Sequence, residues 1–274
     1  MESNSIGFIG AGNMANSLIQ GLLAKTVSPD LIWASDIDER KLQQLADECG
    51  INTASSQQVA ESVDVIVLAV KPQSMEDACQ QLVTTLAERS PLIVSIAAGI
   101  TVTRLQHWLG SDTAIVRCMP NTPALIGKGA SGLFANNFVS DSQKQLAEQI
   151  MATVGLSLWV DSESDIDIVT ALSGSGPAYF FLFMEAMQDA AKKMGLSEEL
   201  ARKLTYQTAA GAAELAMRSE DNTDELRRKV TSPGGTTERA INKFETGGLR
   251  ELVASALQAA RDRSIELADE FGNK

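Results

Sequence analysis

The sequence predicts an α/β domain followed by an all-α domain, with a doubly wound parallel sheet in the first. Two observations carry this prediction. Apolar runs rich in Val and Ile alternate with helical patterns over residues 5–160. After about residue 161 such runs stop, and Ala-rich segments with helical periodicity take their place. The sequence therefore divides into residues 1–160 and residues 161–274.

Each element of the first domain follows from a local pattern. The expected strands are apolar on both faces, as a sheet covered by helices on both sides requires. They are residues 5–10, 31–36, 63–70, 92–97, 114–119 and 156–160. Apolar residues at helical spacing predict the helices between them, at residues 13–25, 39–50, 75–88 and 101–110.

The second domain contains a helix with an unusual surface. The segment "AYFFLFMEAMQDAAKKMG", residues 178–195, begins with apolar residues around its whole circumference. A domain of this size has little interior in which to bury such a helix. We therefore expect a subunit interface there.

Composition limits the possible partners. The net charge of −12 disfavours nucleic acid and anionic membranes, but it does not exclude a small anionic ligand. The spacing of the three cysteines fits neither a zinc site nor a redox pair, which predicts bystander thiols in a reducing compartment. No signal peptide is expected, and the longest apolar stretches fall short of a membrane span. The prediction is a cytoplasmic protein.

A glycine motif follows the first expected strand. The stretch "FIGAGNMA" places Gly10, Gly12 and Ala15 as G-x-G-x-x-A between a strand and a helix, which is the Rossmann dinucleotide fingerprint. Gly10 permits the tight turn, and Gly12 lets the backbone approach a pyrophosphate. Ala15 keeps the helix close to the strand, and the helix N-terminus faces the anion.

The preference between NADH and NADPH is open. Asp36 ends the second expected strand, where an acid can bind the ribose hydroxyls and repel a 2′-phosphate. Arg40 could instead meet that phosphate, or Asp36 could only help to start the next helix. The segments "AVKP" (69–72) and "SIAAG" (95–99) end later strands, where ligands lie in such sheets. Lys71 is either a ligand contact or a surface group.

Common catalytic groups are missing from the sequence. The single histidine, His107, lies on a predicted helix, where a solvated position is expected. No cluster has metal-ligand spacing, so no metal is expected, and no G-x-S-x-G elbow occurs. Hydride transfer to a carbon that is already electrophilic fits this absence of proton-transfer groups.

Five motifs in order resemble the pyrroline-5-carboxylate reductase family over essentially the whole chain. They are "FIGAGNMA", "AVKP", "MPNTPA" (119–124), "LSGSGPAY" (172–179) and "SPGGTT" (232–237). The resemblance implies a Rossmann domain followed by a helical dimerisation domain, with homodimers that often assemble into decamers. It implies reduction of 1-pyrroline-5-carboxylate to L-proline with NADPH or NADH, the last step of proline synthesis. The stretch "ASDIDER" departs from the Ser- or Arg-bearing loops of members that prefer NADPH. The expected cofactor-binding residues are Ile9, Gly10, Ala11, Gly12, Asn13, Met14, Asp36, Ala69, Val70, Lys71, Pro72, Ala97 and Asn121.

The resemblance also assigns a role to the stretch "TSPGGTTERA". A helix is expected to end before Ser232, and a new one to start at Thr236 or Thr237. The free amides and positive dipole at such a start suit the substrate carboxylate. The family places the Thr237 hydroxyl at the ring nitrogen, which makes Thr237 the candidate catalytic residue. The alternative is that this threonine only caps the helix.

Two further segments carry substrate candidates. Residues Ser173 to Gly176 should form either a kink before Pro177 or a notch for helix packing. Glu163 lies near cofactor and substrate in the family, or is a solvated linker acid here. The expected substrate-binding residues are Ser232, Gly234, Gly235, Thr236, Thr237, Glu163 and Ser175.

Two other functions compete with this interpretation. A β-hydroxyacid dehydrogenase shares the two-domain layout but uses a lysine on the helix that opens the second domain. The corresponding segment has no lysine before Lys192, which argues against it. A non-catalytic protein that senses a cofactor and regulates a partner is the third hypothesis.

Overall fold

The computed structural model describes residues 4–272. Its contacts divide the chain into two compact units. The sheet unit comprises Met1–Ser175 with Ala259–Lys274, and the helical unit comprises Gly176–Gln258. These contacts group residues 161–175 with the sheet unit. The domain boundary expected after residue 160 stays a prediction.

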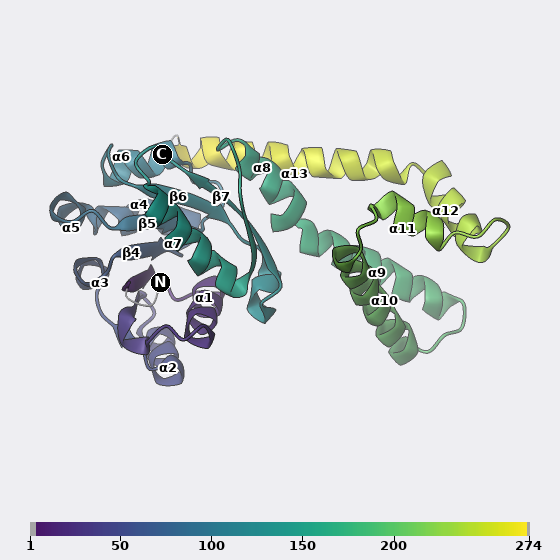
Figure 1. The fold of residues 1–274 in the computed structure, drawn as a ribbon, viewed down its shortest axis with the longest axis horizontal. Coiled ribbons are helices and arrows are strands. Elements are labelled where there is room, and N and C mark those ends of the chain that lie inside the picture. The colour runs from purple at the N-terminus through teal and green to yellow at the C-terminus, as the bar shows by residue number, and fades with distance from the viewer. Residues whose placement is uncertain (1–3, 273–274) are drawn as a thin grey trace. The chain divides into compact units, whose positions relative to one another are not determined.

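The sheet unit is built on one mixed sheet with helices on both faces (Figure 1). Within the described residues the strand order is β3-β2-β1-β4-β5-β6-β7-β8. The strands are β1 (Ile6–Ile9), β2 (Ile32–Ser35), β3 (Asn52–Thr53), β4 (Val65–Leu68), β5 (Leu92–Ser95), β6 (Ile115–Met119), β7 (Gly129–Ala135) and β8 (Gly155–Trp159). Neighbouring strands from β3 to β6 all pair in parallel, so the doubly wound parallel sheet is confirmed.

The last two strands run in the opposite direction, which the sequence analysis did not predict. Strand β7 pairs antiparallel with β6, and β8 pairs parallel with β7. A parallel neighbour would need a crossover of a dozen or more residues. Strands β6 and β7 are joined only by Pro120 to Lys128, which contain the short 3₁₀-helix η3 (Thr122–Ile126). The connection is therefore too short for anything but reversal.

Helices cover both faces of the sheet. The α-helices are α1 (Asn13–Ala24), α2 (Glu39–Cys49), α3 (Ser56–Ser62), α4 (Met75–Gln80), α5 (Val83–Glu88), α6 (Val102–Leu109), α7 (Asp141–Met151) and α8 (Asp165–Val169). Short 3₁₀-helices are η1 (Pro29–Leu31), η2 (Pro72–Ser74) and η4 (Ala152–Val154). The helix expected over 75–88 is two helices with a break at Gln81 and Leu82. Helices α3 and α7 were not predicted.

Two apolar clusters lie on opposite faces of the sheet. On one face, Leu18 of α1 and Ile150 of α7 pack against Phe8 and other strand residues. On the other, Met75 of α4 and Leu105 of α6 pack against the second set of strand side chains. Alternate residues of each central strand belong to different clusters. This explains why these strands are apolar on both faces.

The helical unit contains α9 (Gly176–Lys193), α10 (Glu198–Arg218), α11 (Thr223–Lys229) and α12 (Thr236–Thr246). Helix α13 (Leu249–Gly272) begins in this unit and ends in the sheet unit. Helices α9 and α10 pack as a hairpin (Figure 1).

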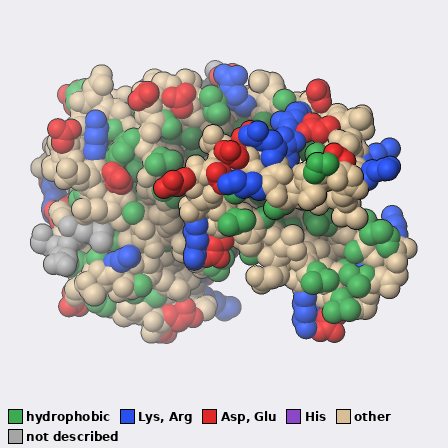
Figure 2. All heavy atoms as spheres, turned by 45° about the vertical axis from the view of Figure 1, so that its right-hand side comes forward, with side chains coloured by type: hydrophobic (Ala, Val, Ile, Leu, Met, Phe, Trp, Pro, Cys, Tyr) green, Lys and Arg blue, Asp and Glu red, His purple; other side chains and the backbone are tan. Residues whose placement is uncertain are grey.

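Hydrophobic side chains gather on the surface of the α9–α10 hairpin (Figure 2). Phe180, Phe181 and Leu182 are 67%, 62% and 67% exposed. The single chain thus leaves the helix with an apolar circumference uncovered, as a subunit interface requires.

Among the described residues, one helix is long and apolar enough to cross a membrane. It is Asp165–Lys193, which includes α8 and α9, and 17% of its most apolar stretch of 18 residues is buried. From the sequence, no apolar segment of that length was expected. The same exposed apolar surface belongs to the face that a partner subunit would cover, so the criterion alone is weak support for a membrane span.

Candidate active site

The glycine motif forms a turn between β1 and α1 at the carboxyl edge of the sheet. Gly10 has φ of +99°, and a Cβ there would lie 2.8 Å from the carbonyl oxygen of Ala69, so only glycine fits. A Cβ at Gly12 would meet nothing within 4 Å. Helix α1 begins without a side-chain cap or an acidic residue in its first turn. Its first amides are therefore open to an anion, which fits a dinucleotide pyrophosphate.

Asp36 is bonded to this turn. Its Oδ2 accepts a hydrogen bond from the amide of Ala11 at 2.6 Å, and its Oδ1 accepts from the amide of Asp38 at 2.9 Å. The N-cap of α2 is Asp38, whose carboxylate accepts from two amides of the first turn. Asp36 is thus not the N-cap of α2, but it binds the amide of the residue that is.

The ends of neighbouring strands meet beside the glycine turn. The amide of Ala69 donates to the carbonyl of Ile9 at 2.8 Å, and the amide of Ile96 donates to that of Leu68 at 3.1 Å. Val70 and Pro72 are half-buried, Lys71 is exposed, and Ala97 is 6% exposed. Asn13 is exposed and Met14 half-buried at the start of α1. The structure thus brings the "AVKP" and "SIAAG" segments to the edge that carries the glycine motif.

Asn121 has its side chain occupied by the protein. Its Nδ2 donates to the carbonyl of Ser173 at 2.9 Å, and its Oδ1 accepts from the amide of Ala130 at 2.8 Å. Only 9% of the residue is exposed. Its predicted contact with the cofactor would therefore have to use the main chain.

The "LSGSGPAY" segment interrupts the α-helix before Pro177, and its close neighbour at Gly174 is a strand residue rather than another helix. Residues Thr170–Gly174 form a π-helical turn (η5), closed by a 2.8 Å bond from the amide of Ser175 to the carbonyl of Thr170. A Cβ at Gly174 would lie 2.6 Å from Met119 Cε. The segment therefore interrupts the α-helix and also packs closely against the "MPNTPA" segment.

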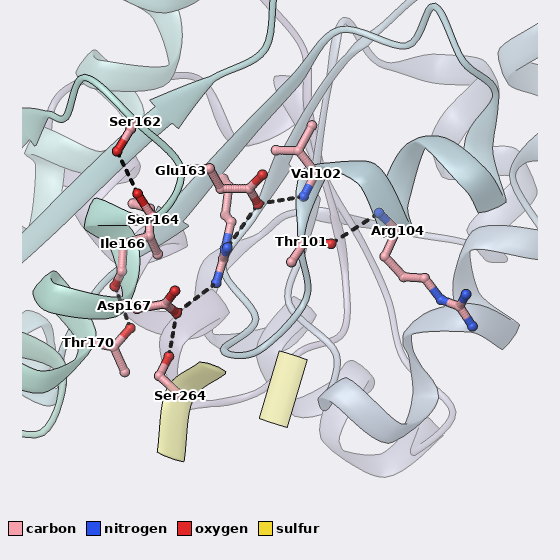
Figure 3. A network of polar contacts seen from close by, with 11 residues as sticks. Thr101, Val102, Arg104, Ser162, Glu163, Ser164, Ile166, Asp167, Thr170 and Ser264 are labelled. Carbon is pink, nitrogen blue, oxygen red and sulfur yellow. Dashed lines mark hydrogen bonds and ion pairs between the residues drawn. The ribbon is translucent and has the colours of Figure 1, made fainter. Parts of the chain in front are cut away.

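Glu163 is not a solvated linker acid, so that alternative is wrong (Figure 3). Its side chain is 24% exposed, and its Oε1 accepts from Arg117 Nη1 at 2.9 Å and from the amide of Val102 at 2.7 Å. Arg117, on β6, has a side chain that is 3% exposed, and its Nη2 lies 3.9 Å from Asp167 Oδ1. Ser264 donates to the same Asp167 oxygen at 2.7 Å.

Arg117 and Asp167 were not among the predicted residues. A signal for Arg117 was present, since it is the one charged residue in the apolar run "AIVRCM". A guanidinium on a buried strand requires carboxylate partners. Its partners could not be identified, because they lie 46 and 50 residues away in sequence.

The helical unit contains the predicted substrate turn. The amide of Gly235 donates to the carbonyl of Ser232 at 3.0 Å, and Gly234 has φ of +73°. Helix α12 begins at Thr236, with Gly235 as N-cap and no side-chain cap. Neither threonine hydroxyl caps this helix, so the plain capping role suggested for Thr237 is wrong. Thr237 is half-buried, whereas Ser232 and Thr236 are exposed.

The turn already holds one carboxylate. Glu238 Oε2 accepts a hydrogen bond from the amide of Gly234 at 2.8 Å. Glu238 was not among the predicted residues, although a glutamate three residues into a helix commonly reaches back to amides before the first turn. The contact identifies a loop amide that is directed at a carboxylate.

The remaining candidates for proton transfer or nucleophilic attack are poorly suited to either. His107 is exposed on α6, as predicted. Burial raises the pKa of the Cys79 thiol to about 12, with a smaller contribution from Glu76, and burial also raises the pKa of Cys118. Cys49 has its pKa raised by burial and then by Glu48. All three cysteines are free, and Cys79 and Cys118 are buried.

A doubly wound sheet with an open, glycine-lined helix start defines the class of the protein: it is an NAD(P)-dependent oxidoreductase. Residues 163–267 match the model of the pyrroline-5-carboxylate reductase dimerisation family. Residues 5–99 match the NADP oxidoreductase, coenzyme F420-dependent family.

Full-length relatives agree with these matches. The chain is 53% identical to pyrroline-5-carboxylate reductase of Pseudomonas aeruginosa, covering 99% of this chain and 100% of the relative. It is also similar to the structure of pyrroline-5-carboxylate reductase from Coxiella burnetii, with a TM-score of 0.94 and 48% identity over 97% and 99% of the two chains. A third similar structure is Plasmodium falciparum pyrroline carboxylate reductase with NADP bound. Its TM-score is 0.86, and its sequence identity is 31% over 98% of this chain and 99% of that one.

The chain belongs to the pyrroline-5-carboxylate reductase family. It is an NAD(P)H-dependent oxidoreductase that reduces 1-pyrroline-5-carboxylate to L-proline, the last step of proline biosynthesis. The dimerisation domain makes it a homo-oligomer. The β-hydroxyacid dehydrogenase and the cofactor sensor are thereby set aside.

Proposed function

We propose that NAD(P)H binds along the carboxyl edge of the sheet, with its pyrophosphate at the start of α1. The open first turn of that helix is the observation that carries this proposal. The residues that would hold the cofactor are Ile9, Gly10, Ala11, Gly12, Asn13, Met14, Asp36, Ala69, Val70, Lys71, Pro72, Ala97 and the main chain of Asn121. Asp36 would meet the adenosine ribose, and the fully exposed Ile37 offers an apolar surface beside it.

We propose that the turn of α12 binds the carboxylate of the substrate. The amides of Gly234 and Thr236 lie at or just before the first turn of a helix, where anions are favoured, and Gly235 closes the turn between them. The bond from the Gly234 amide to Glu238 supports this proposal, because it demonstrates an amide that can hold a carboxylate. Ser232 would shape the turn through the carbonyl that accepts from Gly235.

Thr237 is the proposed catalytic residue. When bound, NAD(P)H supplies a hydride for the imine carbon. The imine nitrogen arrives protonated, so addition of the hydride yields the secondary amine without another proton. A half-buried hydroxyl at that nitrogen can accept its hydrogen bond and orient the ring. Ser175, beside the π-helical turn, is proposed as a second hydroxyl contact. Catalysis then consists mainly of positioning.

The proposed assembly is a homodimer in which two protomers share each active site, with decamers as a further possibility. The exposed apolar residues of α9 support the dimer. The proposed compartment is the cytoplasm, where the three free cysteines would stay reduced.

The experiment is a substrate and cofactor comparison. NADH and NADPH oxidation would be followed separately with pyrroline-5-carboxylate, pyrroline-2-carboxylate and piperideine carboxylates. We expect the highest kcat/KM with pyrroline-5-carboxylate. A higher value with another imine would contradict the proposed substrate site, and the ratio between the two cofactors measures the contribution of the Asp36 region.

A further inference from the structure

Glu163 connects two parts of the sheet unit that are distant in sequence. The same oxygen, Oε1, accepts from the guanidinium of Arg117 and from the amide of Val102. Val102 is the first residue of α6, so its amide is one of the donors that a helix start leaves without an internal partner. The carboxylate also lies at the positive end of the helix dipole. Glu163 therefore fixes the start of α6 from outside that helix.

The start of α6 has a second cap, and this makes the contribution of Glu163 separable. Thr101 is the N-cap, and its Oγ1 accepts from the amide of Arg104 at 3.2 Å. The threonine satisfies the third amide, whereas the glutamate satisfies the first (Figure 3). Removing the glutamate should consequently loosen the residues before the helix more than the helix itself.

The connection from β5 to α6 comprises residues 96–101 and is held from its other side too. Gly99 has φ of +73°, and a Cβ there would lie 3.2 Å from Leu267 Cβ and from Phe271 Cδ2 of α13. The connection therefore packs against the end of α13 at Gly99. The residue that follows it, Val102, is bonded to Glu163. It carries Ala97, a proposed cofactor contact.

Arg117 keeps the carboxylate in place. Its buried guanidinium lies between Glu163 and Asp167, and Asp167 is bonded to Ser264 of α13. A buried guanidinium that lost its partner would be strongly unfavourable, so the arginine restrains Glu163 as much as Glu163 neutralises the arginine. The network spans β6, α6, α8 and the part of α13 that belongs to the sheet unit.

The substrate-binding role that the resemblance gave Glu163 fits these contacts poorly. One of its two carboxylate oxygens, Oε1, already has two protein donors. The substrate itself carries a carboxylate, and two like charges at close range repel one another.

We propose that Glu163 is a positioning residue that acts through Val102 and holds the 96–101 connection against the cofactor. This proposal rests on the proposed cofactor role of Ala97. Arg117 and Asp167 are the groups that hold Glu163 in its working position, and none of the three needs to touch the substrate.

Three variants test the proposal. Glu163→Ala removes both contacts of the carboxylate, and Glu163→Gln keeps an oxygen that can accept from the Val102 amide but removes the charge. The matched control is Glu148→Gln, which alters another carboxylate of the sheet unit, one that accepts a 3.0 Å bond from Trp159 Nε1. The readouts are amide hydrogen exchange over residues 96–104, NADH and NADPH dissociation constants without substrate, kcat, the KM for the imine, and the thermal midpoint.

For Glu163→Ala we expect exchange over 96–104 to be at least about tenfold faster, because an amide loses its partner. Cofactor binding should weaken by about three- to tenfold, and kcat should fall by about tenfold, as displacement of a positioning contact does. The KM for the imine should change by less than about twofold. Glu163→Gln should restore most of the protection, and Glu148→Gln should leave 96–104 unchanged.

Two results would overturn the proposal. A large rise in the imine KM with unchanged exchange and cofactor affinity would make Glu163 a substrate ligand. A lower thermal midpoint with unchanged exchange, affinity and kcat would leave it a stabilising contact only. The cofactor site is tested separately in the unaltered protein. If NADPH and NADH bind without slowing exchange over 96–104, then Ala97 is not a cofactor contact, and the proposed function rather than the Glu163 contact is at fault.

Discussion

The amide of Gly234 donates a 2.8 Å hydrogen bond to the carboxylate of Glu238, four residues further on in α12. This amide belongs to the turn proposed to bind the substrate carboxylate. The free protein therefore satisfies the amide with a carboxylate of its own. Substrate binding at that amide would have to displace Glu238, which makes the residue an internal competitor.

Removal of this competitor should tighten substrate binding. We expect Glu238→Ala to lower the KM for pyrroline-5-carboxylate by about two- to tenfold, since this bond is exposed to solvent and contributes roughly 0.5–1.5 kcal/mol net. Glu238→Gln keeps an acceptor and should have a smaller effect. Glu214→Ala, which removes an exposed acid on α10, is the control. A higher KM in Glu238→Ala would mean that the acid helps to build the site.

Asp36 is expected to limit the use of NADPH. Asp36→Ser should raise the NADPH-to-NADH ratio of kcat/KM by about tenfold, on the order of 1.4 kcal/mol. Because Asp36 also accepts from the amides of Ala11 and Asp38, the same change should loosen the glycine turn and weaken the binding of both cofactors. Asp36→Asn keeps an acceptor and separates the two effects. Steady-state kinetics with each cofactor measure the ratio, and an unchanged ratio would remove Asp36 from the ribose site.

The parallel part of the fold could be predicted because its signal is local. Strands β1, β2, β4, β5 and β6 are apolar on both faces and alternate with amphipathic helices. Strand β7 was missed because "GASGLFA" has four small residues before its first large one. Helix α7 was missed although Ser140 and Gln143 form a capping box that the sequence displays.

The candidate site was only partly predictable, because its contacts join distant segments. The glycine turn is specified by neighbouring residues and was found. The positions of Asn121 and Glu163 depend on partners 52 and 46 residues away. A single sequence contains no spacing rule for such pairs. Both side chains are hydrogen-bonded to other parts of the protein. A motif resemblance does not distinguish a residue that holds the fold together from one that contacts a ligand.

The assembly prediction follows from the exposed face of α9. Leu182 is 67% exposed, and the preceding residues Phe180 and Phe181 are 67% and 62% exposed. Leu182→Asp places a charge in the proposed interface and should shift the protein from dimers or larger assemblies toward monomers. Leu156→Asp, on the edge strand β8, is a comparison outside the dimerisation domain. Light scattering of the unaltered protein that gave a mass near 29.2 kDa at micromolar concentration would contradict the prediction.

The cysteines predict a pH dependence with a definite sign. Burial raises the pKa of Cys79 from about 9.0 to about 12, so the folded state favours the neutral thiol. Its contribution to stability is complete below about pH 9 and is lost as the pH rises toward 12. At pH 8 the thiolate fraction of Cys79 should be about 10⁻⁴, compared with roughly one tenth for an exposed thiol whose pKa is about 9.0. Labelling with a thiol reagent should reach Cys79 and Cys118 only after unfolding, and rapid labelling of the native protein at Cys79 would refute this.

Thr237 gives the sharpest separation between activity and stability, because its hydroxyl does not cap α12. The structure gives Gly235 that position and places Thr237 second in the helix. Thr237→Ala should therefore leave the thermal midpoint nearly unchanged or raise it slightly, since alanine is the better helix former. If the hydroxyl supports the imine nitrogen, the same change removes a hydrogen bond to a charged group worth roughly 1.5–3 kcal/mol. That corresponds to a loss of about 10- to 150-fold in kcat/KM.

The control for Thr237 lies on the same helix. Thr246 donates its hydroxyl to the carbonyl of Asn242 at 2.8 Å, so Thr246→Ala removes a hydroxyl from α12 without touching the proposed site. Thr237→Ser should recover most of the activity, because it keeps the hydroxyl. Cofactor dissociation constants should be the same in all three variants, since the glycine turn belongs to the other unit. The measurements are kcat/KM for the imine, the thermal midpoint and NAD(P)H affinity. A Thr237→Ala variant that reduces the imine as efficiently as Thr246→Ala would show that the hydroxyl does not act on the nitrogen, and positioning would then rest on the amides of the turn alone.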